Sequence, residues 1–116
     1  TYFWDFGSRL DSGGGIIAQM LCHFIDLFGY LFDDIEPLGG YAATLIGDKP
    51  VALPPLAPGG PKREGERKPV DADDSVTLVG VLPNLAPATI SANWVTPGMS
   101  GTRWEIRGSE GSLIYQ

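Results

Sequence analysis

The side chains of this sequence that could carry out acid–base chemistry share one strip of a predicted helix. His23 is the only histidine, Gln19 precedes it by four residues and Asp26 follows it by three. Residues at these spacings are neighbours on a helix surface. Burying such a line of polar groups without partners costs free energy, so we expect it to face a polar cavity, where His23 could exchange a proton with a substrate hydroxyl. The alternative is a structural pair of His23 and Asp26 that caps a neighbouring strand end.

A run of three glycines, Gly13–Gly15, opens the same predicted helix. The run follows no predicted strand and lacks the glycine spacing of a dinucleotide or P-loop motif, so it does not indicate a phosphate site. Each glycine costs about 1 kcal/mol at a helical position. We therefore expect a ligand or another domain to approach the backbone closely there.

Composition excludes several classes of function. The 116 residues carry a net charge of −6, with one cysteine and one histidine. The acidic balance argues against binding to nucleic acid or to an anionic membrane surface. The cysteine and histidine counts exclude an internal disulfide and a metal site built from several of these residues, and the pairs Asp33–Asp34 and Asp73–Asp74 are interpreted as turn residues. No membrane span is expected, because Gln19, His23 and Asp26 interrupt the longest apolar stretch.

The secondary structure needed to position these residues is one helix on a sheet. Apolar residues recur with helical spacing from Gly13 to about Phe32, with Asp11 or Ser12 as the N-cap. We expect Phe24 and Phe28 to be buried against the sheet. Strands are predicted over 38–46, 76–82, 89–95 and 102–107, the second of them central.

Two alternating strands and one irregular segment complete the predicted domain. Ile90, Ala92 and Trp94 alternate with polar residues, and so do Trp104 and Ile106. Short turns between the strands favour antiparallel neighbours, which gives a single α+β domain over residues 1–116. Residues 47–74 hold six prolines, four glycines and eleven charged residues, and they are predicted to form an exposed loop without regular structure.

Two strings of the sequence resemble the Gfo/Idh/MocA oxidoreductases. Residues 12–32, SGGGIIAQMLCHFIDLFGYLF, are similar to the family's helix signature G-G-G-x-x-x-D-x-x-x-H-x-x-D. Residues 73–116 are similar to its later strands and include the turn G-x-x-G-S-L at 108–113. The resemblance implies part of a C-terminal α/β domain with an open, mainly antiparallel sheet. Family members join that domain to an N-terminal Rossmann domain that binds NAD(H) or NADP(H).

The resemblance also implies a function and a site. His23 matches the family's catalytic histidine, whereas Gln19 stands where many members carry an aspartate. The resemblance implies the substrate side of an NAD(P)-dependent dehydrogenase that oxidises a sugar, a cyclitol or a related polyol. The residues expected to contact the substrate beside His23 are Trp4, Gly14, Gly15, Gln19 and Asp26. The alternative, which Gln19 favours, is a non-catalytic regulator that senses a sugar or NAD(P) on the same scaffold.

Further expectations concern the rest of the protein. The start of the chain, rich in aromatic residues, is interpreted as cut from a longer protein. NAD or NADP is expected to bind mainly to the missing N-terminal domain, so this chain alone is expected to bind no cofactor and to be inactive. We expect a cytoplasmic protein that binds no metal and that forms a homo-oligomer through the uncovered sheet.

Overall fold

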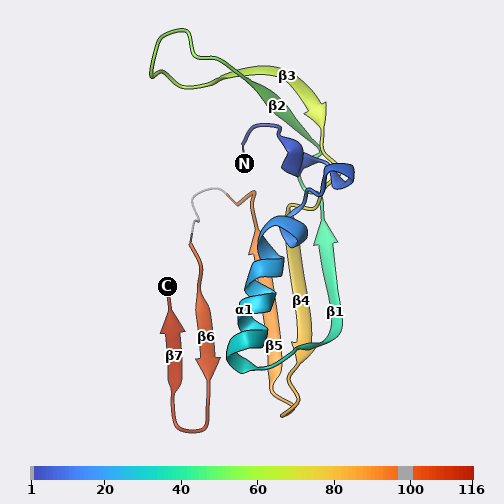
Figure 1. Cartoon of the computed structure of the whole chain (residues 1–116), viewed down its shortest axis with the longest axis vertical. Helices are drawn as coiled ribbons and strands as arrows, with labels where there is room; N and C mark the ends of the chain where they lie inside the picture. The colour runs from blue at the N-terminus through green and yellow to red at the C-terminus, as the bar shows by residue number, and fades with distance from the viewer. Residues whose placement is uncertain (1, 97–100) are drawn as a thin grey trace.

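The computed structural model describes residues 2–96 and 101–116, and it forms an α+β fold (Figure 1). Two 3₁₀ turns, Phe6–Ser8 and Leu10–Ser12, precede a π-helical turn, Ile17–Leu21, that continues into the α-helix α1. The bounds of the α-helix and the strands are α1 Cys22–Phe32, β1 Glu36–Ala43, β2 Asp48–Leu53, β3 Arg63–Pro69, β4 Ser75–Val81, β5 Pro87–Asn93, β6 Trp104–Arg107 and β7 Ser112–Tyr115.

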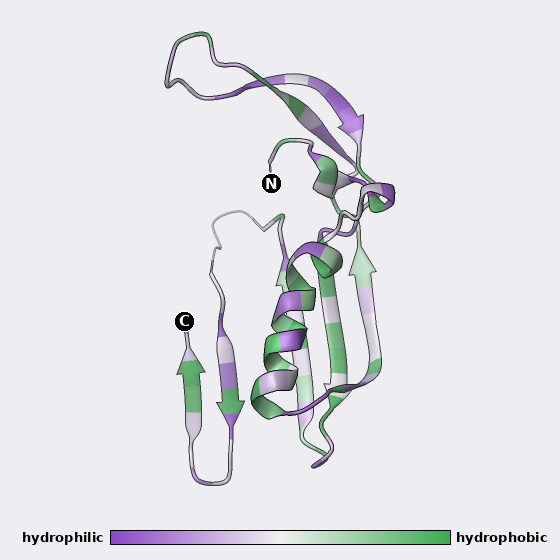
Figure 2. Ribbon diagram, viewed as in Figure 1, coloured by the Kyte–Doolittle hydropathy of each residue, from purple (hydrophilic) through white to green (hydrophobic). Residues whose placement is uncertain are grey.

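The main sheet has the order β1-β4-β5, with both pairs antiparallel. Strand β4 is central, as its apolar sequence predicts, and Figure 2 shows hydrophobic residues along much of it. The helix covers one face of this sheet (Figure 1). Ile16, Leu21 and Val76 form the buried core between them, and Phe24 packs against that core.

The predicted alternation along β5 and β6 is confirmed. Ile90, Ala92 and Trp94 are partly buried against the core, whereas the intervening polar residues of β5 are exposed. Trp104 of β6 lies over the helix, with its ring centroid 6.2 Å from that of Phe24 and 6.3 Å from that of Phe28. Both phenylalanines are half-buried. Phe24 and Phe28 therefore face the sheet as predicted, but the predicted burial is wrong: no residue of α1 is buried, and Leu27 and Leu31 are 43% and 52% exposed.

The predicted start and cap of the helix are wrong. The helix begins at Ile16, because Gly13 and Gly15 have φ values of +75° and +104°, outside the helical region. Ser12 belongs to a separate 3₁₀ turn. Asp73 caps the helix instead: its carboxylate accepts the Ile17 N–H at 3.0 Å and its carbonyl accepts the Ile16 N–H at 2.8 Å.

The irregular loop predicted for residues 47–74 is also wrong in part, since β2 and β3 form an antiparallel hairpin. Six of the connecting positions are proline or glycine, but they gather at 54–61 between the strands. Cross-strand charges support the pairing, as the Arg67 guanidinium donates to the Asp48 carboxylate at 2.7 Å. The hairpin projects from the body and gives the molecule its long axis of 57 Å (Figure 1).

The segment Leu10–Phe32 is long and apolar enough to cross a membrane by length and composition alone, although its polar residues predict no membrane span. In the structure this segment is divided, because three glycines separate the 3₁₀ turn at Leu10–Ser12 from the helix. Its apolar residue Phe24 packs on the sheet core. Of the most apolar part of this segment, 17% is buried inside the domain.

Asp74 is a buried carboxylate, 1% exposed, at the start of the central strand. It accepts hydrogen bonds from the backbone N–H groups of Leu45 at 2.8 Å and Ile46 at 2.9 Å. Its own N–H donates to Ala43 O, and its carbonyl accepts the Trp94 N–H, both at 2.9 Å. Asp74 therefore ties the ends of β1 and β5 to β4.

Replacing Asp74 with alanine should lower the free energy of unfolding by about 2–4 kcal/mol, because two backbone N–H groups lose their acceptor. Denaturant unfolding of the Asp74→Ala and Glu110→Gln variants measures this cost. Glu110 is an exposed carboxylate in the turn between β6 and β7, so its variant should match the unsubstituted protein. Equal stability of both variants would contradict the role given to Asp74.

Candidate functional site

His23 lies in the first turn of α1 with its side chain exposed. Among residues 2–96 and 101–116, no hydrogen bond or ion pair of its imidazole is found, and Asp26 is likewise exposed and unpaired with it. The structure therefore gives no support to the alternative of a structural His23–Asp26 pair. An exposed imidazole without a protein partner is free to contact a substrate from outside the chain.

Gln19 lies in a different environment from His23, although four residues separate them. The segment Ile17–Leu21 is a π-helical turn, in which the Cys22 N–H donates to Ile17 O, five residues earlier. Gln19 is half-buried and contacts the first 3₁₀ turn, where a Cβ atom on Gly7 would lie 2.8 Å from Gln19 Oε1. Its Nε2 atom is buried with no hydrogen-bond partner among the described residues. The single polar strip predicted for the helix is thus divided by burial.

The glycine run makes the close backbone contacts that its sequence predicts, but with the chain itself. The Gly14 N–H donates to Arg9 O at 2.8 Å, and the Gly15 N–H donates to Gly7 O at 3.1 Å. A Cβ atom on Gly14 would lie 2.5 Å from Gly7 O, and one on Gly15 would collide with the Asp73 carboxylate. With Asp73 at the helix N-terminus, this region does not fit the phosphates of a dinucleotide.

Trp4 lies against the β2–β3 hairpin. Its indole N–H donates to Pro69 O at 3.0 Å, its backbone N–H donates to Pro50 O at 2.8 Å, and the Lys68 ammonium lies 4.9 Å from its ring centroid. The indole is thus engaged by the hairpin, whereas His23 lies on α1. The structure does not bring these two predicted site residues into contact.

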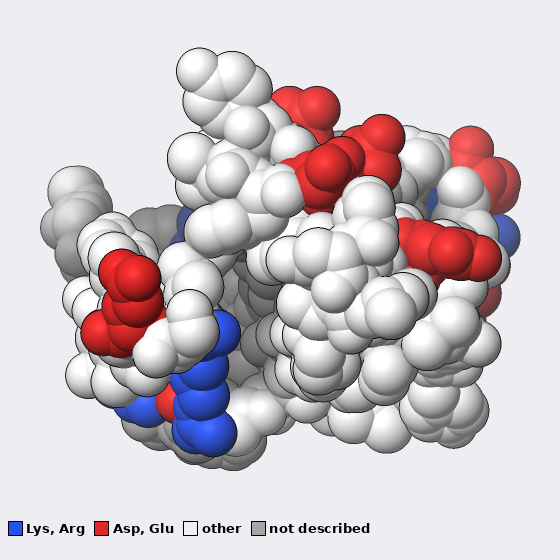
Figure 3. Space-filling view, turned by 90° about the horizontal axis from the view of Figure 1, so that it is seen from below, with Lys and Arg blue, Asp and Glu red and all other residues white. Residues whose placement is uncertain are grey.

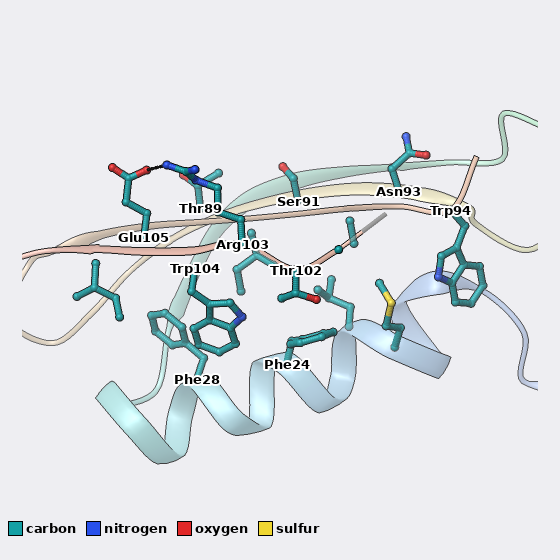
Figure 4. Close-up of a pocket in the computed structure, with 16 residues that line it drawn as sticks. Phe24, Phe28, Thr89, Ser91, Asn93, Trp94, Thr102, Arg103, Trp104 and Glu105 are labelled. Atoms are coloured by element: carbon teal, nitrogen blue, oxygen red, sulfur yellow. Dashed lines mark hydrogen bonds and ion pairs between the residues drawn. The ribbon is translucent and has the colours of Figure 1, made fainter. Parts of the chain in front are cut away.

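A groove of about 540 Å³ separates β5 from β6 beside α1, and none of the predicted site residues lines it (Figure 4). Met20, Phe24 and Phe28 of the helix form its apolar floor, with Trp104 over them. Glu105 lies at the rim of the groove. Its carboxylate accepts hydrogen bonds from Arg107 and Arg103, which lower the pKa of the carboxyl group, and the bond from Arg107 has the larger effect. The sequence predicts the alternating faces of these strands but carries no signal for the separation between them.

A shallower depression of about 630 Å³ lies on the exposed side of α1. Asp26 lines it together with Ile17, Ile25 and Tyr30. Among the residues that the structure describes, no group of three or more histidine, cysteine, aspartate or glutamate side chains is placed to hold a metal ion. His23 is exposed on the same helix but is not among the residues that line this depression.

Comparison with known proteins identifies this arrangement. A sequence profile described as the GFO/IDH/MocA C-terminal domain matches residues 2–114. The chain belongs to the GFO/IDH/MocA family. It is 28% identical over 115 residues to levoglucosan dehydrogenase of Pseudarthrobacter phenanthrenivorans, and 27% identical over 111 residues to an uncharacterized oxidoreductase of Synechocystis sp.. These alignments cover 97% and 96% of this chain but 29% and 28% of the relatives.

Solved structures agree with the GFO/IDH/MocA fold. The apo form of levoglucosan dehydrogenase superposes with a TM-score of 0.78 at 26% identity, covering 97% of this chain and 29% of that one. An oxidoreductase domain protein from Kribbella flavida gives a TM-score of 0.68 at 25% identity, covering 99% and 32%. The family resemblance and the α+β fold expected from sequence are confirmed, and the chain spans less than a third of the length of these relatives.

Replacing Gly15 with alanine should lower the free energy of unfolding by about 2–4 kcal/mol. The reason is the positive φ at Gly15 combined with the collision of the new Cβ with the carboxylate that caps the helix. Thermal or denaturant unfolding measures the loss. Gly47→Ala is the matched control, since a Cβ there meets nothing within 4 Å. A Gly15→Ala variant as stable as Gly47→Ala would show that the close approach is absent.

Proposed function

We propose that this chain is the substrate side of an NAD(P)-dependent oxidoreductase that acts on the CH–OH group of a sugar, cyclitol or related polyol. The proposal rests on His23, which is exposed on α1 with no hydrogen bond or ion pair among the described residues, and which the resemblance aligns with the family's catalytic histidine. A relative that matches nearly the whole chain is named levoglucosan dehydrogenase, which supports a sugar-like substrate.

The proposed chemistry of this chain is proton transfer at His23. The imidazole accepts the proton of the substrate hydroxyl, and a positioned group of this kind contributes typically about 10²- to 10⁴-fold to the rate. The nicotinamide cofactor, held mainly by the rest of the full-length protein, supplies the acceptor for the hydride. Asp26, three residues along the helix, is placed to accept a hydrogen bond from a second hydroxyl.

Gln19 has a binding role in this proposal and no role as a base. A carboxamide cannot take up a proton near neutral pH, but its Nε2 can donate to a hydroxyl oxygen. In this structure Nε2 is buried against the first 3₁₀ turn with no partner among the described residues, so a substrate oxygen reaches it only if that turn moves. Gln19 in place of the family's aspartate favours the second candidate, a regulator that binds NAD(P) and a sugar without turnover.

Replacing His23 with alanine in the full-length protein should lower kcat by about 10²- to 10⁴-fold. The thermal midpoint should change little, because the exposed side chain makes no hydrogen bond or ion pair among the described residues. NAD(P)-linked oxidation across a panel of sugars, anhydrosugars and cyclitols measures turnover, and calorimetry measures the midpoint. Glu110→Gln is the control for an exposed substitution outside the site.

Two results would contradict this proposal. Turnover in the His23→Ala variant equal to that of the unsubstituted protein would remove His23 from the reaction. Tight NAD(P) binding with no oxidation of any substrate in the panel, before and after Gln19→Asp, would favour the regulator instead.

The uncovered face of the main sheet is the surface that we propose for homo-oligomer formation. Tyr41 and Val79 on this face are 75% and 43% exposed. Thr77 and Ser91 lie beside Tyr41 in the same cross-strand row, and their hydroxyls are 3.0 Å apart. Exposed aromatic and aliphatic residues with satisfied polar neighbours are typical of protein interfaces.

Replacing Tyr41 with arginine should weaken self-association of the full-length protein at least about tenfold, because a charge would be buried at the contact. Sedimentation equilibrium measures the association constant. Tyr30→Arg is the matched control, as Tyr30 is 86% exposed but lies on the helix. An unchanged constant for Tyr41→Arg, or an equal loss for both variants, would place the interface elsewhere.

A further inference from the structure

The outer edge of β5 carries backbone groups without partners. At the two ends of the β4–β5 ladder, the Leu82 N–H donates to Ala86 O and the Trp94 N–H donates to Asp74 O, both at 2.9 Å. Backbone groups of successive strand residues point to opposite edges. The even-numbered residues of β5 therefore bond to β4, and Thr89, Ser91 and Asn93 direct their N–H and C=O groups away from it, where no described residue bonds to them.

Strand β6 presents a second free edge on the other side of the groove. The Gly108 N–H donates to Gly111 O at 2.8 Å at the closed end of the β6–β7 pair. By the same alternation, Trp104 and Ile106 bond to β7, and the backbone groups of Glu105 and Arg107 point away from it. Both outward-facing edges border the same groove, since Thr89, Ser91 and Glu105 line it.

The two edges belong to one amphipathic layer. Ile90 and Ala92 of β5 and Trp104 of β6 all face α1, whereas the polar side chains of both strands lie on the opposite side (Figure 4). The space-filling view shows the hollow between the β6–β7 pair and the remainder of the domain, with basic side chains along the β6–β7 side (Figure 3). Strands β5 and β6 thus have their apolar faces on the same side and their polar faces on the same side, but no hydrogen bonds join the two strands among the described residues.

We propose that one further β-strand, supplied by the part of the full-length protein outside this chain, occupies this groove and joins β5 to β6. The chain spans less than a third of the length of its relatives, so a full-length protein of their size would supply ample further sequence. The inserted strand carries alternating apolar and polar residues, with its apolar side chains on Phe24 and Phe28 and no proline in the paired stretch.

The geometry favours this occupant over a second copy of the chain. A strand in the groove is bonded along both edges and covered by α1 on one face, as a central strand of a domain is. Strands β5 and β6 run in opposite directions (Figure 1), so one inserted strand is antiparallel to one neighbour and parallel to the other. A parallel neighbour in the same chain requires a long crossover connection, which a strand distant in the sequence provides.

Hydrogen–deuterium exchange of the full-length protein, resolved to single amides, tests the proposal. The outer-edge amides of Ser91, Asn93 and Glu105 should exchange at least about a hundredfold more slowly than amides open to solvent. Ile90 and Ala92 are the internal reference, because they bond to β4 in either case. Exchange of the outer-edge amides at the rate of open amides would overturn the proposal.

Dilution separates the inserted strand from a second copy. Protection supplied by the same polypeptide persists when the protein is diluted to the monomer, whereas protection that disappears with the dimer would overturn the proposal. Proline provides a second measurement: Ser91→Pro and its control Ser91→Ala both lose the hydroxyl that contacts Thr77, but Ser91→Pro also loses the outward N–H and has a restrained φ, so it should lower the thermal midpoint of the full-length protein by several degrees relative to Ser91→Ala. Equal midpoints of these two variants would show that no strand bonds to this edge.

Discussion

The position of the helix on the sheet depends on the hydrogen bonds of one short segment, residues 71–74. Asp73 caps the helix through its carboxylate, and Asp74 binds the backbone after β1 through a carboxylate that is almost wholly buried. Ser8 O accepts the N–H groups of Asp71 and Ala72 at 3.2 and 3.4 Å, which fixes the N-terminal turns to the same segment. A buried carboxylate is tolerated only when it is hydrogen-bonded. The position of the helix that carries His23 therefore depends on these hydrogen bonds.

The glycines and the π-helical turn are consequences of that attachment. The helix can approach Asp73 and the carbonyls of the first turns only where no Cβ intervenes, which explains glycine at positions 14 and 15. The π-helical turn then adds a residue between the capped end and α1. It leaves Gln19 against the first turn and His23 exposed, so two residues that a regular helix would align face different surroundings.

The sequence predicted those parts of the fold that depend on side-chain periodicity. The central strand β4 and the alternating faces of β5 and β6 were predicted, because burial on one face imposes a period of two. The cap from Asp73 was missed, since it lies 56 residues from Ile17 and local signals favoured Asp11 or Ser12. The β2–β3 hairpin was missed because prolines and charges suggested a loop, whereas cross-strand pairs and bonds to Trp4 stabilise it. Of the candidate site, the polar strip of the helix and the family resemblance both pointed to His23, whose role stays a prediction, whereas the separation of Gln19 from it depends on the helix geometry.

The two sides of α1 carry different residues and face different parts of the protein. With 3.6 residues per turn, Asp26 lies almost opposite Phe24 on the helix, and His23 lies about a quarter of a turn from Phe24. The side with Phe24 and Phe28 is apolar, and the groove beside it offers both aromatic rings and the outward backbone groups of β5 and β6, which is the combination that the proposed strand would use. The side with His23 and Asp26 is exposed and mixed in character, since Ile25 and Tyr30 lie beside Asp26, and it makes no contact with the sheet core. If the proposed strand were absent from the groove, the position of His23 would change only if α1 moved as a whole. The hydrogen bonds of Asp73 and Asp74 oppose that movement.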